Sequence, residues 1–393
     1  MRIILFCGKG GVGKTSVAAA TGLALARAGK RTLVMSLDPA HSLSDSFDHQ
    51  GDSLVDHAKG SLVELEHNLF IQEVDVLEEV HRHWKEIHGY LAALLAVSGV
   101  DEVLADELAI IPGMEEASCL LYINKYAREK TFDVIVLDCA PTGESLRFIS
   151  FPSILKWYMD KLYSLERTIA KVARPVVKHL TNIPLPGDEY FDNLRELFGK
   201  IEGVDALLAD PKITTVRLVT NPEKMVVKET QRAYVYFCLF GLLVDGVVIN
   251  RILPQDLKES FFDGWKQTQR RSIKEIEDSF SPVPLMTVPL FDNEVVGREG
   301  LARLADAVYG KRNPALVLYS ARPLTFKKSR GVYTMTMTLP FVSTDDLDLT
   351  RVEDSLVVRL GAFRRHVPLP RGIPPEAEIS AELSGSDLKV RFG

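Results

Sequence analysis

The sequence predicts a doubly wound α/β fold with a mostly parallel sheet, an inserted helical subdomain and, after it, a small antiparallel β-sandwich. Three observations predict it. Short apolar runs alternate with helical patterns over the first part of the chain, as in strands buried on both faces of a parallel sheet. A glycine-rich turn separates the first such strand from the first helix. After about residue 320 the pattern changes to a period of two, which is typical of antiparallel strands.

The expected parallel strands are short apolar runs bounded by turns or helical patterns. The first leads directly into the glycine-rich turn, and the helix expected next, Thr15–Ala28, ends at Gly29. The run "FDVIVLD" is continuously apolar and ends in an acid. In chain order the expected strands are Ile3–Cys7, Arg31–Leu37, Val134–Leu137, Thr214–Thr220, Val244–Asn250 and Pro284–Val288.

Two long stretches break this alternation. Leu77–Lys130 and Phe151–Asp210 are rich in apolar and aromatic residues and show helical patterns without strands. We interpret them as one helical subdomain inserted into the α/β core. Their apolar faces fit two interpretations, packing against that core or an exposed groove for a partner.

The segment "KRNPAL", Lys311–Leu316, is the expected domain boundary. The α/β domain therefore spans residues 1–312 and the β-domain residues 320–393. In "VYTMTMTLPF" and "SLVVRLGAFRRHVPLP" apolar and polar residues alternate, and prolines and Gly361 separate short strands.

Charge and composition narrow the class of protein. The net charge of −6 over 393 residues argues against a nucleic-acid binder. The four cysteines form no close pair, which excludes a C-x-x-C zinc or redox site and fits a reduced, intracellular protein. No apolar run is long enough to span a bilayer. Because the chain starts with a strand, there is no room for a signal peptide. We expect a cytoplasmic location, or an organelle stroma if a transit peptide was removed.

The stretch "GKGGVGKT", residues 8–15, matches the phosphate-binding pattern G-x-x-x-x-G-K-T between a strand and a helix. Its glycines let backbone N–H groups surround phosphate oxygens, and the helix start adds its positive end. We expect Lys14 to reach the β- and γ-phosphates of ATP, and the Thr15 hydroxyl to ligate Mg²⁺. The expected nucleotide contacts are Gly8, Gly10, Gly11, Val12, Gly13, Lys14, Thr15 and Ser16.

Two acids end expected strands, at the edge where open α/β sheets bind their ligands. Asp38 follows the second strand, in "MSLDPAHSLSDSF", and is the candidate for polarising the attacking water. Asp138, in "VLDCAPTGES", fits a position behind the ligands of Mg²⁺. Each acid could instead cap the turn that follows it.

These motifs together resemble one family. "GKGGVGKTS", "DPAHSLSDSF" and "DCAPTGESLRF" are similar to the arsenical-pump ATPases and their relatives that guide tail-anchored membrane proteins, within the deviant P-loop class. "IPGMEEA", "VVINRILP" and "VPLFDNEVVGREGL" resemble further segments of that family in the same order, so the resemblance covers about residues 1–312. It implies an ATP hydrolase, and adenine contacts by Asn250, Pro289 and Leu290.

The resemblance also assigns the second lysine of the loop, Lys9. It implies that Lys9 reaches across a two-fold axis to the partner's nucleotide, so that hydrolysis requires a homodimer closed at the nucleotide face. A cation supplied in trans raises phosphoryl-transfer rates by roughly 10³–10⁵ where this has been measured. The resemblance likewise implies that Asp38 orients the water, and that the segments around Asp38 and Asp138 are switch loops that order around the γ-phosphate.

The sequence departs from the family in three places. "FFDGWKQTQRRSIKEI" has no cysteine where targeting-type relatives carry a zinc-binding C-x-x-C pair, so we expect no zinc. Glu144 replaces a usual histidine, with an unknown effect on the second switch loop. The arsenite-pump ATPases are double-length, so this single half is expected to pair with itself. Cys119 and Cys139 are the candidate metalloid ligands, or else buried structural thiols.

The β-domain resembles the α-crystallin core of small heat-shock proteins, and a branch of the family carries such a domain. The preferred hypothesis is a dimeric Mg-dependent ATPase whose switches open and close an apolar helical surface for hydrophobic, tail-anchor-like client segments. The alternative is the ATPase subunit of an arsenite or antimonite efflux system. A partition-type ATPase disagrees with the acidic charge, and an iron–sulfur reductase relative disagrees with the position of Cys139.

Overall fold

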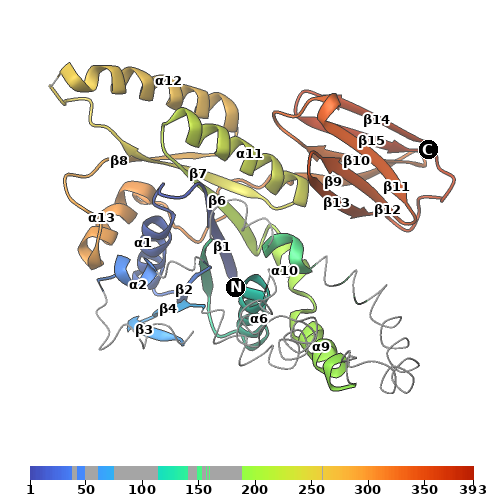
Figure 1. The fold of residues 1–393 in the computed structure, drawn as a ribbon, viewed down its shortest axis with the longest axis horizontal. Coiled ribbons are helices and arrows are strands. Elements are labelled where there is room, and N and C mark those ends of the chain that lie inside the picture. The colour runs from blue at the N-terminus through green and yellow to red at the C-terminus, as the bar shows by residue number, and fades with distance from the viewer. Residues whose placement is uncertain are drawn as a thin grey trace, which may run out of the picture.

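The computed structural model describes residues 1–37, 42–48, 61–74, 114–139, 148–152, 156, 159, 188–258 and 260–393. Its centre is an eight-stranded sheet with the order β3-β4-β2-β5-β1-β6-β7-β8 (Figure 1). All neighbours are parallel except β3 and β4, which are antiparallel. The strands are β1 Arg2–Cys7, β2 Thr32–Ser36, β3 Val63–Glu66, β4 Leu69–Glu73, β5 Val134–Asp138, β6 Thr214–Thr220, β7 Val244–Ile252 and β8 Leu285–Pro289.

Alternate side chains of the strands build two cores, one on each face of the sheet. Ile3, Leu5 and Cys7 of β1 belong to one core, and Ile4 and Phe6 belong to the other. Each of the five side chains is fully buried, which explains why the strand reads as a continuous apolar run.

The helices cover both faces (Figure 1). The core that contains Ile4 is closed by α1 Lys14–Arg27, α2 Ser42–Ser46 and α13 Gly297–Tyr309. The opposite core is closed by α6 Met114–Glu129, α9 Asp188–Ile201, α10 Val204–Ala209, α11 Lys224–Phe240 and α12 Asp263–Phe280, the last preceded by the short helix η3 Ser260–Phe262. The doubly wound α/β prediction is confirmed.

The predicted strands agree with the observed ones to within two residues at each end. The hairpin of β3 and β4 is not among the predicted strands. In β3, at one edge of the sheet, Val63–Glu66 has no fully buried residue and therefore no continuous apolar run. The described parts of the two helical stretches are helical, in α6, α9 and α10. Most of residues 77–113 and 153–187 lies outside the described residues, so the helical subdomain stays an expectation there.

The C-terminal strands form two antiparallel sheets around a separate core, as predicted. One sheet has the order β14-β15-β10-β9 and the other β11-β12-β13. The strands are β9 Leu324–Ser329, β10 Val332–Thr338, β11 Leu347–Val352, β12 Ser355–Leu360, β13 Phe363–Pro368, β14 Ile379–Ser384 and β15 Asp387–Phe392, with η4 Thr344–Asp346 between β10 and β11.

The β-domain packs on the C-terminal half of α11. Val235 and Leu239 of this helix are buried in the core of the β-domain. The rings of Tyr236 and Phe363 lie 4.1 Å apart between centroids. The guanidinium of Arg365 donates a hydrogen bond to the carbonyl of Leu239, and its burial lowers the pKa of Arg365 to about 10. The β-domain is therefore attached to the α/β domain by specific contacts as well as by the chain.

None of the helices among the described residues combines the length and apolarity that a membrane span needs.

Candidate active site

The glycine-rich loop lies at the carboxyl end of the central strand β1, where the chain turns into α1. Gly11 and Gly13 have φ values of 80° and 91°, a left-handed conformation that glycine adopts without strain. A Cβ on Gly8 would lie 2.2 Å from the carbonyl oxygen of Val219, and one on Gly13 would lie 2.5 Å from Nδ2 of Asn250. The loop therefore needs glycine at these positions for close packing as well as for its curvature.

Lys14 begins α1 and is almost completely buried. Its Nζ donates a hydrogen bond to the carbonyl oxygen of Lys9, 3.3 Å away, across the loop. A lysine ammonium beside the N-terminus of a helix offers positive charge where a phosphate can bind. The predicted position of Lys14 in the loop is thus matched by its geometry, although its role in hydrolysis stays a prediction.

Thr15 and Ser42 bring two hydroxyl groups together. The Oγ of Ser42, at the start of α2, is 3.4 Å from Oγ1 of Thr15. Two ligands at right angles on Mg²⁺, each at about 2.1 Å, lie about 3 Å apart. The hydroxyl pair therefore fits this ion with a small adjustment. From the sequence alone, Ser42 is only part of an expected switch segment, because a lone serine gives no metal-binding signal.

Asp138 ends β5 and is fully buried at the same edge of the sheet. Asp138 pairs in register with Phe6 of β1 and with Ser36 of β2. It therefore lies between the glycine-rich loop and the segment that leads to Asp38. Its predicted role behind the ligands of Mg²⁺ remains a prediction. Asp38 and Glu144 lie outside the described residues.

Asn250 supports the loop from β7, which is separated from β1 by β6. Its Nδ2 donates to the carbonyl oxygen of Val12 at 2.9 Å, and its Oδ1 accepts from the backbone N–H of Arg251 at 2.9 Å. Pro289 and Leu290 follow along the same edge, where Leu290 N–H donates to the carbonyl oxygen of Ile252 at 2.8 Å. Leu290 is 44% exposed. The structure thus gathers the three expected adenine contacts at one edge.

Lys9 directs its side chain to α11. Its Nζ lies 3.7 Å from Oε2 of Glu229, and both side chains are partly exposed, at 38% and 27%. The carbonyl oxygen of Lys9 accepts a hydrogen bond from Lys14, as described above. The side chains of the two lysines therefore extend in different directions from the same loop. Of the other predicted contacts, Gly10 is exposed, Val12 is buried and Ser16 is half-buried.

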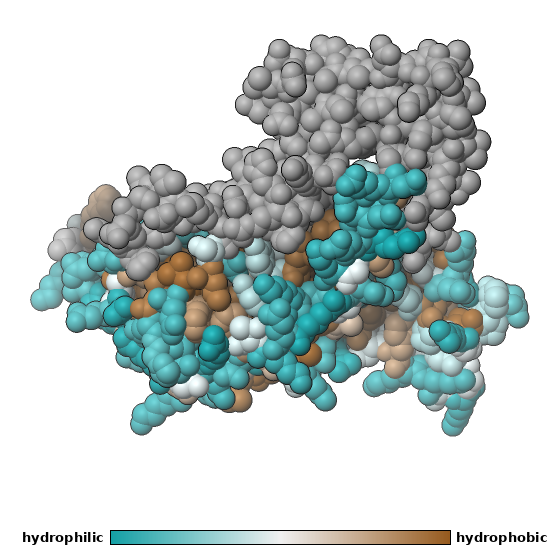
Figure 2. Space-filling model, turned by 90° about the horizontal axis from the view of Figure 1, so that it is seen from below, coloured by the Kyte–Doolittle hydropathy of each residue, from teal (hydrophilic) through white to brown (hydrophobic). Residues whose placement is uncertain are grey.

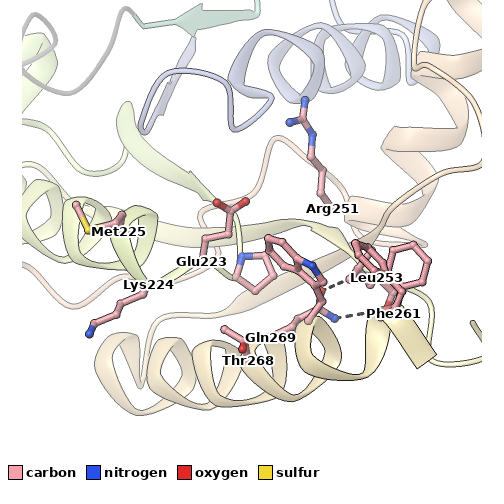
Figure 3. A pocket seen from close by; sticks show the side chains of 11 residues that line it. Glu223, Lys224, Met225, Arg251, Leu253, Phe261, Thr268 and Gln269 are labelled. Carbon is pink, nitrogen blue, oxygen red and sulfur yellow. Dashed lines mark hydrogen bonds between the residues drawn. The ribbon is translucent and has the colours of Figure 1, made fainter. Parts of the chain in front are cut away.

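A groove of about 560 Å³ lies next to this site, between the start of α11 and the η3–α12 segment (Figure 3). Its wall includes the exposed side chains of Met225, Phe261 and Trp265. Figure 3 shows Glu223 and Arg251 directed to the side of the groove where the blue ribbon of β1 and α1 lies. The groove therefore lies beside Asn250, because Arg251 in its wall directly follows that residue.

The four cysteines are free and buried. Burial, the neighbouring Cys7 thiol and the nearby Asp138 raise the pKa of Cys139 well above its ordinary value, so Cys139 is a neutral thiol at physiological pH.

Two family models match the chain. The model described as "Anion-transporting ATPase" matches residues 1–310, and that described as "HSP20-like domain found in ArsA" matches residues 330–392. A protein of Aquifex aeolicus named "Putative arsenical pump-driving ATPase 1" is 48% identical over 97% of this chain and 98% of its own length. A similarly named protein of Chlorobaculum tepidum is 37% identical, over 94% of this chain and 90% of its own. "ATPase ARSA2" of Chlamydomonas reinhardtii is 31% identical, over 78% and 83%.

Proposed function

Because the chain belongs to the anion-transporting ATPase family, we propose that two copies of it hydrolyse Mg-ATP together, with Lys9 of each copy acting on the other's nucleotide. ATP hydrolysis itself is the activity of the family. The observation that supports the paired arrangement is the orientation of the two lysines. Lys14 is buried inside the loop, whereas Lys9 extends outward to Glu229 and is partly exposed.

The residues of the chain fit this reaction. The loop N–H groups and Lys14 hold the β- and γ-phosphates. Asp38 is proposed to orient a water that attacks the γ-phosphorus as the bond to the β–γ bridging oxygen breaks. ADP leaves with that oxygen, and the water's proton ends on the released phosphate. The hydroxyls of Thr15 and Ser42 would hold Mg²⁺, which neutralises phosphate charge when bound, with Asp138 behind them.

Dependence on chain concentration tests the paired arrangement. If each site needs a lysine from a second chain, ATP turnover per chain rises with protein concentration until dimers saturate, and sedimentation shows dimers forming over the same range. A chain that stays monomeric throughout while its turnover per chain is constant contradicts the proposal.

For the output of hydrolysis, we propose that the ATPase drives a pump for arsenical anions. The names of the two relatives whose similarity extends through the β-domain favour this function over client binding. We expect that neither Cys119 nor Cys139 binds the cargo, because both are buried. In addition, burial raises the pKa of Cys139, whereas a thiolate is the form that binds soft ions.

Measurements of ATP turnover with arsenite or antimonite test this output. We expect either anion to raise turnover, and the stimulation to persist in Cys139→Ser. If neither anion changes turnover and removing the protein from its host does not alter the accumulation of arsenite, the pump assignment is wrong.

Binding of hydrophobic clients is the second candidate, and the docked HSP20-like domain favours it. On the face drawn in Figure 2, the described surface is mainly hydrophilic, with scattered apolar patches. A pull-down with an apolar helical peptide tests this candidate. Retention by the ATP-bound chain that disappears with ADP supports it, and equal retention of a peptide with charged substitutions contradicts it.

A further inference from the structure

Glu73 is a buried carboxylate that none of the sequence motifs includes. It ends β4, and only 5% of it is exposed. Its Oε1 accepts hydrogen bonds from the backbone N–H groups of Leu43 at 3.0 Å and Ser44 at 3.1 Å. Its Oε2 accepts from the Ser44 hydroxyl at 2.8 Å. Both oxygens of the carboxylate are therefore bonded to the first turn of α2.

These hydrogen bonds stabilise the short helix α2 and fix its position. The helix α2 has five residues, and so short a helix is unstable without tertiary contacts. N–H groups of a first helical turn have no partner within the helix, and a carboxylate both satisfies them and complements the helix dipole. Leu43, fully buried in the core, gives the turn its second anchor.

Ser42 immediately precedes the two residues that Glu73 binds. Its hydroxyl meets Thr15 at 3.4 Å because the turn is held in this position. We propose that Glu73 is a positioning residue of the magnesium site, which holds Ser42 beside Thr15 so that both hydroxyls ligate the Mg²⁺ of the bound nucleotide. This inference rests on the proposed function, which assigns Mg²⁺ to Thr15.

Magnesium titrations of nucleotide binding test this role separately from turnover. A fluorescent ATP analogue is bound to the full-length chain, and Mg²⁺ is added from a chelated start. We expect Glu73→Gln to raise the Mg²⁺ concentration for half-maximal tight binding about tenfold, because groups that orient a metal ligand usually contribute 10- to 100-fold in metal affinity. Affinity for the analogue without Mg²⁺ should not change.

Ser42→Ala should raise the Mg²⁺ requirement by a similar factor. In the double variant with Glu73→Gln, the two effects should not multiply, since Glu73 acts through Ser42. Ser44→Ala removes one of the three hydrogen bonds to Glu73 and should raise the Mg²⁺ requirement by a smaller factor. This variant can be measured in place of Glu73→Gln if the latter folds poorly.

Asp245→Asn is the matched control. Asp245 is a buried carboxylate on the same sheet that also accepts a backbone N–H, from Leu318 at 3.1 Å, but it is bonded to Arg217 rather than to α2. If both variants shift the Mg²⁺ requirement equally, or neither does, Glu73 has only a structural role and the inference is overturned. If Thr15→Ala leaves the requirement unchanged, the magnesium assignment of the proposed function fails instead.

Discussion

The two lysines of the glycine-rich loop lie in different surroundings although they are only five positions apart in the sequence. Lys14 is enclosed by the loop, where its ammonium meets the carbonyl oxygen of Lys9. Lys9 is partly exposed and pairs with Glu229 on a helix outside the loop. An exposed pair of this kind is worth little in stability, so Lys9 can leave Glu229 when a stronger anion is offered.

This difference predicts different defects in the two alanine variants. Lys9→Ala should keep its affinity for ATP but lose turnover by about a thousandfold, as expected for a cation supplied in trans. Lys14→Ala should weaken ATP binding itself. Calorimetric titration and single-turnover assays separate the two effects. Normal hydrolysis by Lys9→Ala would refute the trans assignment and leave Lys9 as a surface residue.

The buried thiol of Cys238 on α11 makes the free energy of unfolding depend on pH in the alkaline range. Its burial raises the pKa of the thiol from 9.0 to about 12, although a hydrogen bond with Tyr234 acts in the opposite direction. The unfolded chain loses this proton near pH 9 and the folded chain does not. The contribution of the neutral thiol is therefore complete below pH 9 and is lost as the pH rises from 9 towards 12.

We predict that this loss is visible in a comparison with Cys238→Ala. Between pH 7 and pH 10 the wild-type free energy of unfolding should fall by about 1 kcal/mol more than that of the variant. Urea denaturation at both pH values measures the difference. Parallel pH profiles would contradict the assignment, because the variant keeps every other titrating group.

At the scale of elements, α11 ends where the β-domain touches it. Gly241 caps the helix with a φ of 78°, and a Cβ there would lie 2.8 Å from both terminal nitrogens of Arg365. Gly29 follows α1 with a φ of 79°, and nothing lies within 4 Å of the corresponding position. The two glycines therefore share a conformation and differ in their neighbours.

We predict that Gly29→Ala lowers the free energy of unfolding by about 1–2 kcal/mol, the usual cost of a left-handed alanine. Gly241→Ala should lower it further, since Arg365 must also give up its place at the end of α11. Thermal and urea denaturation of both variants give the comparison. Equal losses would show that Arg365 moves aside without cost and does not fasten the β-domain.

The helices and strands differ in how well the sequence alone predicts them. Buried strands such as Thr214–Thr220 are predictable, because burial on both faces leaves a continuous apolar run. The edge strand β3 is not, since one exposed side removes that pattern. In the site, the glycines and Lys14 follow from one contiguous motif. Glu73 and Glu229 could not be found, because each acts on a residue distant in sequence through contacts that only the fold creates.

At the scale of the whole molecule, a buried ion pair ties the connection between the domains to the sheet. The guanidinium of Arg217 lies 3.3 Å from Asp245, and both side chains are fully buried. Its Nη2 donates to the carbonyl oxygens of Pro314 at 2.8 Å and Leu316 at 3.0 Å. The segment that connects the two domains is therefore fixed to the large sheet by the hydrogen bonds of Arg217.

Removing the cation should release this segment. Loss of one partner from a buried pair costs about 3–5 kcal/mol, so we predict that Arg217→Met is destabilised by this amount and that trypsin then cleaves after Lys311 and Arg312. The control is Arg303→Met, which breaks an exposed pair with Asp292 and should leave stability and cleavage nearly unchanged. Resistance of Arg217→Met to trypsin in this segment would show that other contacts hold it.

The helix α11 contributes buried side chains to the hydrophobic cores of both domains. Val227 and Phe237 are buried in the core of the large sheet, whereas Val235 and Leu239 are buried in that of the β-domain. The domain boundary near residue 312 therefore does not divide the chain into two units that unfold independently. Unfolding of α11 would break its contacts with both domains at the same time. We therefore expect the two domains to unfold as one cooperative unit. A version shortened before residue 320 would not be the remaining half of this protein; it would be a molecule with an uncovered apolar stripe.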